Sequence, residues 1–292
     1  MSRFRAVNDE TSRYIVAVDF GTTFSSVAYC RVTKAMKEEG SPLNLGKVQC
    51  IQNYPYDRPL PGTRYRREPR EDVPTELWYT TLPPSISREA RSEPDGSESM
   101  DWARFDDDGD DDEDEQVATN PRQRLGAPYW GFGVQDQLRQ ASLAKNDACW
   151  MKRFKLLLEN SEHTEHVRGT LKETARELKR AKLIEKDTDV ISEFLTRLFS
   201  HTKHELRRQE RDYNDSTPIE FVLCVPPLWS PKACRIMQTA MSVAIQHSGL
   251  SGLADAEVDN LFIVSEPEAA AAYVLEETGT IISVSNFHLQ AF

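Results

Sequence analysis

The sequence predicts an α/β fold. Short apolar runs at 14–19, 219–225 and 261–264 have the length and composition of sheet strands, and the last two are typical of buried ones. Well-bounded amphipathic segments at 230–249 and 269–277 follow these two runs and are typical of helices. Since strand, helix, strand and helix in succession indicate a β-α-β unit, we expect a mixed sheet flanked by helices.

The amino-terminal half is predicted to consist mainly of strands. The run 14–19 and a second strand over 26–31 flank the tight turn Gly21-Thr22-Thr23, which is the pattern of a β-hairpin. The other elements expected in this half are strands within 46–52, 73–80 and 129–134 and a loop over 54–70.

The carboxyl-terminal half is predicted to be mainly helical. Apolar residues at helical spacing give one buried stripe to a helix over 189–212. The continuous apolar run 219–225 suits a strand in a sheet that is covered on both faces. In the next helix Ser230 is the expected N-cap, Pro231 suits the first turn, and Gly249 ends the helix.

The negative charge is concentrated in one segment. The chain has 292 residues, enough for one large or two modest domains, and a net charge of −11. Nine acidic residues lie within 106–115, so the rest of the chain carries a net charge of only −2. Because no basic excess is available to neutralise phosphates, we expect no nucleic-acid partner.

Two segments hold too little apolar surface to offset the entropy of ordering them. We expect disorder at the N-terminus, 1–13, and in an acidic insertion at 82–127, which is rich in Pro, Ser, Arg and Asp. A calcium-loop pattern around 106–115 would place the cation Arg104 at its first ligand position. The insertion is therefore interpreted as an acidic tether that binds protein partners.

Cysteine and histidine spacing gives no metal or disulfide framework. The five cysteines include no C-x-x-C pair and are predicted to be reduced core thiols. The pairs His163/His166 and His201/His204 are predicted to lie on polar helix faces. No apolar stretch approaches the ~18 residues that span a bilayer, so we expect no membrane partner and a cytoplasmic location, with the nucleus as an alternative.

The turn after the first strand is a candidate phosphate site. Gly21 would let the backbone approach a phosphate, while Thr22 and Thr23 supply hydroxyl donors. Asp19 at the strand end can hold a hydrated Mg²⁺ ion. An ordinary hairpin turn that contains hydroxyls is the alternative interpretation.

Three motifs in order resemble one family. They are VAVDFGTTFSSVAY at 16–29, VLCVPPLWSPKACRIMQTAMSVA at 222–244 and IVSEPEAAAAYVL at 263–275. They resemble the first phosphate loop, the connecting segment and the following strand and helix of the heat shock protein 70 family. VPTELWYT at 73–80 and YWGFGVQDQ at 129–137 also resemble parts of that family. The resemblance implies an actin-like ATPase (ribonuclease H-like) fold over 14–275.

The resemblance assigns a role to each candidate residue and implies ATP or ADP with Mg²⁺ as cofactors. Asp19 would contact a magnesium-bound water, and Gly21, Thr22 and Thr23 would cradle the β- and γ-phosphates. Glu266 would orient the metal-bound waters or the attacking water. The alternative for Glu266 is a carboxylate that stabilises a helix N-terminus.

A phosphate-contacting lysine is implied within 150–155. Lys152 and Lys155 are both candidates, and the sequence does not choose between them. Such a lysine would stabilise charge on the transferred phosphoryl group, whereas the alternative is a solvated lysine on a helix face. Pro226 resembles the family's switch proline, although a proline at a strand end needs no such role.

The resemblance ends after Leu275. The family would continue into a glycine-rich second phosphate loop, but residues 276–292 form a divergent tail without it. We therefore expect a truncated, chaperone-type lobe that binds ATP, hydrolyses it weakly or not at all, and exposes apolar surface. The alternative is a non-enzymatic scaffold that uses the lobe and the acidic insertion to bind partners, and a sugar kinase of the same superfamily ranks last.

Overall fold

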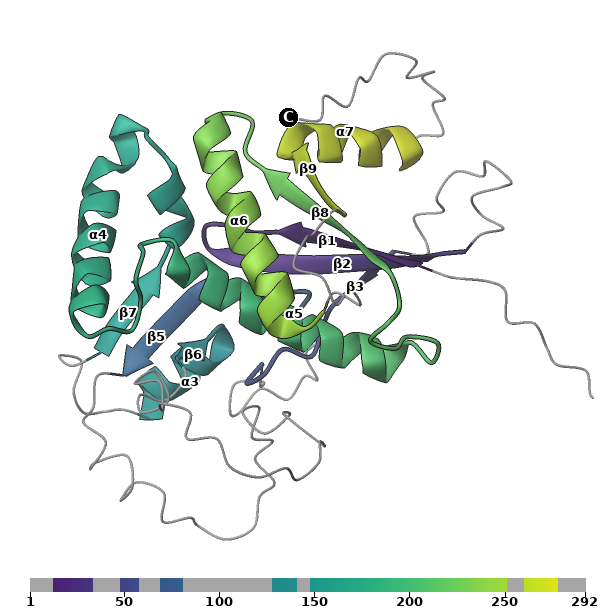
Figure 1. The fold of residues 1–292 in the computed structure, drawn as a ribbon, viewed down its shortest axis with the longest axis horizontal. Helices are drawn as coiled ribbons and strands as arrows, with labels where there is room; N and C mark the ends of the chain where they lie inside the picture. The colour runs from purple at the N-terminus through teal and green to yellow at the C-terminus, as the bar shows by residue number, and fades with distance from the viewer. Residues whose placement is uncertain are drawn as a thin grey trace, which may run out of the picture.

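The described part of the chain comprises residues 13–33, 48–57, 69–80, 128–140, 148–250 and 260–277 of a computed structural model. It contains a large mixed sheet flanked by helices and a smaller antiparallel sheet beside it (Figure 1). The expected disordered segments lie outside the described residues, except that Arg13 already belongs to the first strand. The expected tail at 276–292 also lies outside them, apart from its first two residues.

The large sheet is built on a hairpin joined to two parallel strands. Strands β1 and β2 pair antiparallel, β8 pairs parallel with β1, and β9 pairs parallel with β8, in the order β3-β2-β1-β8-β9 with β4 also on β2. The bounds are β1 Arg13–Asp19, β2 Phe24–Val32, β3 Gln49–Cys50, β4 Asp72–Pro74, β8 Ile219–Val225 and β9 Leu261–Ser265. The hairpin and the parallel strands predicted from the sequence are confirmed.

The strand predicted at 73–80 is divided between the two sheets. Its first part is β4, and its second part is β5, the central strand of the small sheet. Thr75 lies between them, where its N–H donates to the carbonyl of Thr23 at 2.9 Å and its hydroxyl lies 2.8 Å from that of Ser25. The small sheet consists of β5 Glu76–Thr80, β6 Tyr129–Trp130 and β7 Ala148–Lys152.

The strand predicted at 129–134 is wrong beyond Trp130. Gly131 adopts a positive φ of 55°, a conformation that glycine tolerates and that ends the strand. The chain then enters helix α3, Phe132–Gln140, whose Val134 is fully buried. The apolar residues after Gly131 therefore face the core from a helix.

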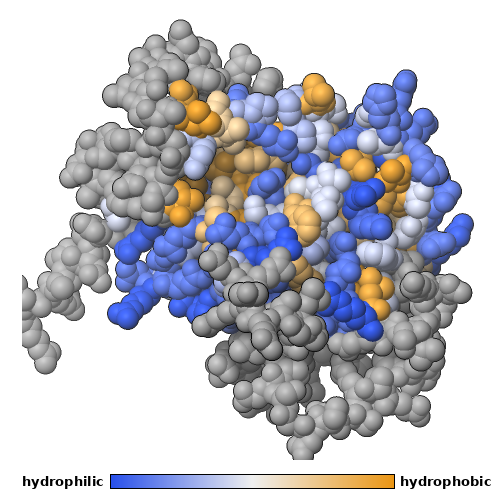
Figure 2. Space-filling model, turned by 180° about the vertical axis from the view of Figure 1, so that it is seen from behind, coloured by the Kyte–Doolittle hydropathy of each residue, from blue (hydrophilic) through white to orange (hydrophobic). Residues whose placement is uncertain are grey.

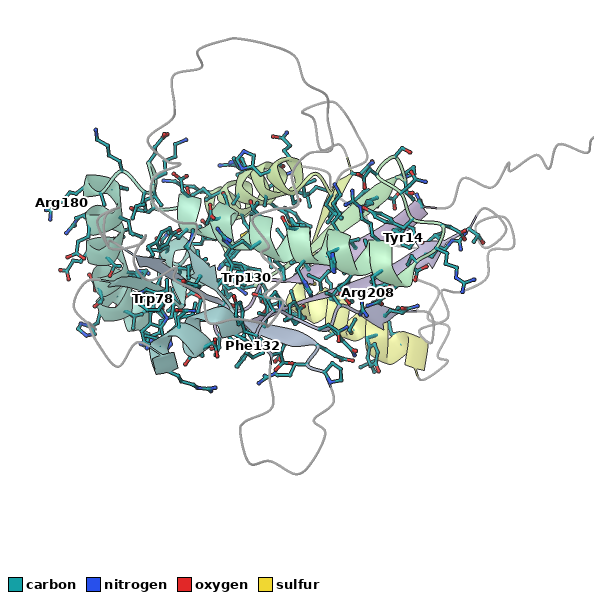
Figure 3. All side chains as sticks on the ribbon, turned by 90° about the horizontal axis from the view of Figure 1, so that it is seen from below. Tyr14, Trp78, Trp130, Phe132, Arg180 and Arg208 are labelled. Atoms are coloured by element: carbon teal, nitrogen blue, oxygen red, sulfur yellow. The ribbon has the colours of Figure 1, made fainter. Side chains whose placement is uncertain are left out.

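The helices of the carboxyl-terminal half follow the predicted punctuation. Ser230 caps α6 by accepting a hydrogen bond from the N–H of Ala233, and Gly249 ends it in the left-handed conformation. The bounds are η4 Phe154–Leu158, η5 Glu162–Thr164, α4 Glu165–Arg180, α5 Asp189–Gln209, α6 Pro231–Ser248 and α7 Glu266–Glu277. In Figure 3, Trp78 of β5 and Arg180 of α4 lie towards one end of the molecule and Tyr14 of β1 towards the other.

One face of the large sheet is buried beneath α5 and α6. The Phe199 ring of α5 lies 5.9 Å from that of Phe221 on β8, and Phe221 is 1% exposed. Alternate residues of β8 are only half-buried, and Glu220 among them pairs with Arg13. The prediction of a sheet covered on both faces is therefore met only in part, because this second face of β8 is covered less completely than the first. Figure 2 views the molecule from behind, on the side away from α5 and α6, and shows apolar side chains in a hollow there.

The strand predicted as buried at 261–264 is an edge strand of the described sheet. Phe262 of β9 is 45% exposed, and Tyr273 and Val274 of the following helix α7 are more than half exposed. Ser265 and Glu268 cap α7 reciprocally, since the Glu268 carboxylate accepts the Ser265 N–H at 3.0 Å and the Ser265 hydroxyl accepts the Glu268 N–H. This capping box explains why α7 begins at Glu266, three residues before the predicted start.

Candidate functional site

The three motifs meet at the carboxyl ends of the parallel strands. Asp19 at the end of β1 is in register with Cys224 on β8, and Cys224 is in register with Val264 on β9. Glu266 follows at the first position of α7. Because ligands of open α/β sheets bind beyond the carboxyl ends of the strands, this edge is the candidate functional site.

The hairpin turn of the site depends on its glycine. A Cβ atom on Gly21 would overlap the carbonyl oxygen of Phe24, so no other residue fits the turn without a change in the backbone. Phe20 anchors the turn, since its buried ring lies 5.9 Å from that of Phe154. Thr22 is half-buried and Thr23 is exposed, which leaves the turn open on one side.

The structure separates the two candidate lysines. Lys155 lies in η4 with its side chain 6% exposed, and its ammonium is 3.1 Å from a carboxylate oxygen of Glu266. Lys152 is an exposed residue at the end of β7, where its ammonium lies 4.3 Å from the centre of the Trp150 ring. Lys155 is therefore brought to Glu266, whereas Lys152 is held against its own strand.

A strained residue directs Lys155 into the site. Arg153, between β7 and η4, has a φ of 60°, which is unfavourable for a residue with a side chain. This bend places Phe154, fully buried, into the core and Lys155 against Glu266. The segment 150–155, in which the resemblance implies the lysine, thus comprises the end of a strand, a left-handed residue and the start of a 3₁₀ helix.

The charges at this edge influence one another. Partial burial raises the pKa of Asp19, and the carboxylate of Glu266 raises it further, while the Lys155 ammonium opposes both effects. Burial and the same two carboxylates raise the pKa of the Cys224 thiol. With two carboxylates and one ammonium, the edge has a net negative charge when all three groups are ionised.

Two residues of the site were not assigned to it from the sequence. Cys224 was counted only as a core thiol, although its place one residue before the end of the strand puts it beside Asp19. Trp229 was given no role from the sequence, and its ring centre lies 5.4 Å from the Lys155 ammonium. The cap at Ser265 was also missed, although the S-x-x-E spacing of Ser265 and Glu268 predicts it.

The described residues offer few other candidate sites. They contain no group of three or more His, Cys, Asp and Glu side chains that could hold a metal ion, and none of their helices is long and apolar enough to span a membrane. His163 and His166 are exposed as predicted, but His201 is 1% exposed. The polar-face prediction is wrong for His201 because the buried stripe of α5 extends over it.

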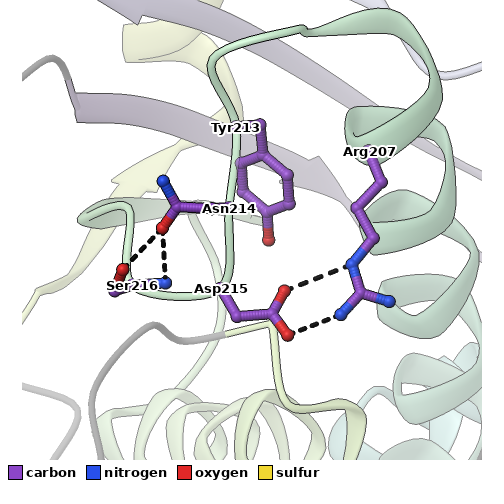
Figure 4. Close-up of a pocket in the computed structure, with 5 residues that line it drawn as sticks. All are labelled: Arg207, Tyr213, Asn214, Asp215 and Ser216. Atoms are coloured by element: carbon purple, nitrogen blue, oxygen red, sulfur yellow. Dashed lines mark hydrogen bonds and ion pairs between the residues drawn. The ribbon is translucent and has the colours of Figure 1, made fainter.

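A shallow pocket lies at the opposite end of β8, lined by the residues labelled in Figure 4. Both Nε and Nη2 of Arg207 donate to the Asp215 carboxylate, and the Lys203 ammonium lies 3.5 Å from it. The hydrogen bonds from Arg207 and the charge of Lys203 overcome the effect of burial and lower the pKa of Asp215. Since the cations there are already paired with this carboxylate, the pocket is a weaker candidate for an anionic ligand.

No family model and no curated protein matches the chain.

Proposed function

We propose that this protein is a heat-shock-70-like protein that binds ATP or ADP with Mg²⁺ at the carboxyl edge of the large sheet. The observation that carries the proposal is the approach of Lys155 to Glu266 at 3.1 Å, next to the hairpin turn that follows Asp19. Segments that are far apart in the sequence thus supply an ammonium, two carboxylates and two hydroxyls to one place. Hydrogen-bond donors and an ammonium suit phosphate oxygens, and carboxylates suit the Mg²⁺ ion that accompanies a nucleotide.

The arrangement of the large sheet supports the actin-like part of the proposal. The first strand of the hairpin, β1, pairs in parallel with β8, and β8 pairs in parallel with β9. The turn 20–23 and the start of α7 therefore lie at the same edge of the sheet. In this proposal the described residues belong to the first lobe of an actin-like ATPase. The cytoplasm is the location that we propose, with the nucleus as the alternative, and the free cysteines Cys30, Cys50, Cys224 and Cys234 suit either compartment.

The residues present fit a magnesium ion that arrives with a nucleotide. Mg²⁺ in phosphate sites keeps several waters and uses one or two carboxylates, so Asp19 and Glu266 are sufficient without a third protein ligand. When bound, the ion would neutralise phosphate charge. Lys155 would hold a phosphate oxygen, and the hydroxyls of Thr22 and Thr23 would donate to neighbouring oxygens.

Strong ATPase activity is not part of the proposal. Phosphoryl transfer depends on positioning and on charge stabilisation from all sides of the phosphate. The described donors come from one sheet edge, so turnover should be slow or absent. A turnover rate typical of an efficient ATPase, abolished by Asp19→Asn, would contradict this part of the proposal.

The two lysines provide a matched test of nucleotide binding. Mg-ATP should raise the melting temperature of the wild-type chain, because a ligand that binds only the folded state stabilises it by about 2.7 kcal/mol at 100 times its Kd. Lys155→Met should remove most of this shift, whereas Lys152→Met should retain it. Differential scanning fluorimetry measures these shifts in melting temperature. Equal shifts in both variants would argue against a role for Lys155.

The second candidate function is a non-enzymatic scaffold. It is favoured by the exposed apolar side chains of β9 and α7, which are available to a protein partner. The acidic insertion that this reading also uses lies outside the described residues. A scaffold predicts that Mg-ATP leaves the melting temperature of the wild-type chain unchanged, so the same experiment separates the two functions.

A further inference from the structure

The Lys155 ammonium has a second neighbour besides Glu266. The centre of the Trp229 ring lies 5.4 Å away, within the ~6 Å over which an ammonium is attracted to an aromatic face. The Lys155 side chain is 6% exposed, so water screens this attraction little. The pair is therefore a partly desolvated cation-π contact in the wall of the candidate site.

Trp229 lies in the turn that joins β8 to α6. The backbone N–H of Trp229 donates to the carbonyl of Pro226 at 3.2 Å, which closes a turn directly after β8. The next residue, Ser230, caps α6, and the Trp229 ring packs against the hydrophobic core. The turn and this packing thus position the ring beside the Lys155 ammonium.

The two neighbours of Lys155 act differently on an anionic ligand. The Glu266 carboxylate neutralises the ammonium and competes with a phosphate for it, and Glu266 is 44% exposed and free to turn away. The Trp229 ring attracts the ammonium without cancelling its charge. The ring leaves all three N–H donors of the ammonium available to phosphate oxygens, whereas a carboxylate occupies at least one of them and offsets its charge.

We propose that Trp229 is a positioning residue of this phosphate site. Its ring holds the Lys155 ammonium in place while a phosphate group of the nucleotide replaces Glu266 as the anionic partner. The inference rests on the proposed nucleotide-binding function and assigns to it a residue that acts through Lys155. Because the ring lies against the group that changes partner, its fluorescence should change when the ligand binds.

The affinity for Mg-ATP tests the role of the ring. Trp229→Leu should raise the Kd measured by isothermal titration calorimetry about tenfold, while Trp229→Phe, which keeps an aromatic face, should stay within about threefold of wild type. Leu228→Ala is the matched control, since the neighbouring Leu228 is 95% exposed and should leave the Kd unchanged. Urea unfolding of each variant verifies that it is folded.

A double-mutant cycle separates positioning from packing. In a Lys155→Met background, Trp229→Leu should change the Kd less than twofold, because the cation that the ring positions is absent. Comparison with Trp229→Phe identifies the part of the fluorescence change on Mg-ATP binding that comes from Trp229. This part should also disappear in Lys155→Met. A purely structural ring would change the Kd equally in both backgrounds and would overturn the inference.

The two proposals fail in different ways. If the wild-type chain binds Mg-ATP and Trp229→Leu binds it equally well, the inference about Trp229 is wrong and nucleotide binding stands. If the wild-type chain binds no Mg-ATP in calorimetry, the proposed function is wrong and the inference falls with it.

Discussion

A single buried histidine ties α5 to the segment that follows β3. The Nε2–H of His201 donates to the carbonyl of Gln52 at 2.9 Å, and the ring lies 4.9 Å from that of Tyr54. One turn further, Glu205 accepts a hydrogen bond from Asn53. The sequence could not show this, because the spacing of His201 and His204 among charged residues is also that of a solvated helix face.

His201 should make stability depend on pH. Burial lowers its pKa, and His204 and Arg208 lower it further, while the bond to Gln52 and the charge of Glu205 oppose this. Since the folded-state pKa lies below the unfolded value of about 6.5, the unfolded chain takes up the proton first and stability falls as the pH drops below about 6.5.

A comparison of two histidine variants tests this pH dependence. Between pH 7.5 and pH 5.5, the free energy of unfolding measured with urea should fall less for His201→Gln than for the wild-type protein. The control His204→Gln, a change of the same kind at a half-buried position of the same helix, should keep the wild-type dependence. A wild-type slope in His201→Gln would show that another group governs the acid sensitivity.

At the scale of elements, the sequence predicted best where local chemistry decides the structure. The N-cap Ser230 and the C-cap Gly249 predicted the bounds of α6, and the tight turn predicted the antiparallel pair β1 and β2. The prediction failed where packing decides, as in the division of the strand 73–80 at Thr75. At the site, the sequence placed both carboxylates, but only the fold distinguishes Lys155 from Lys152.

The end of α4 carries a residue that local chemistry disfavours. Lys182 has a φ of 57°, its N–H donates to the carbonyl of Lys179, and the N–H of Leu183 donates to that of Leu178. These two bonds form a Schellman motif, in which glycine is the usual left-handed residue. Lys182 is exposed, so its side chain contributes little that would offset the strain.

Lys182→Gly should therefore stabilise the protein. The expected gain in the free energy of unfolding is roughly 0.5–1 kcal/mol, since relief of the left-handed strain outweighs the greater freedom of glycine in the unfolded chain. Lys172→Gly, at an exposed position within the same helix, should instead cost about 1 kcal/mol. Chemical denaturation of both variants measures the difference, and a loss at Lys182 would contradict the argument.

At the scale of the whole molecule, the large sheet is asymmetric. One face lies under α5 and α6 with Phe221 fully buried, while the neighbouring strand β9 presents Phe262 on the other side at 45% exposure. Both strands are short apolar runs in the sequence, and periodicity alone cannot tell which of their faces are covered. Large apolar side chains are also exposed on α7, where Tyr273 and Val274 are more than half exposed.

Two phenylalanine truncations test this asymmetry. Phe221→Ala should cost about 3–5 kcal/mol of unfolding free energy, because it leaves a cavity beside Phe199. Phe262→Ala should cost less than about 1.5 kcal/mol, because nearly half of that side chain is already in water. Similar losses from both truncations would mean that the outer face is covered as fully as the inner one.

The pairing of β1 with β8 has a consequence for synthesis. Tyr14 lies opposite Ile219, so the first strand must wait for a partner made about 200 residues later. At about 5–20 residues per second, a ribosome needs roughly 10–40 s to produce that stretch. Throughout this interval the nascent hairpin has an unpaired apolar edge, and the cell must keep it from pairing with other chains.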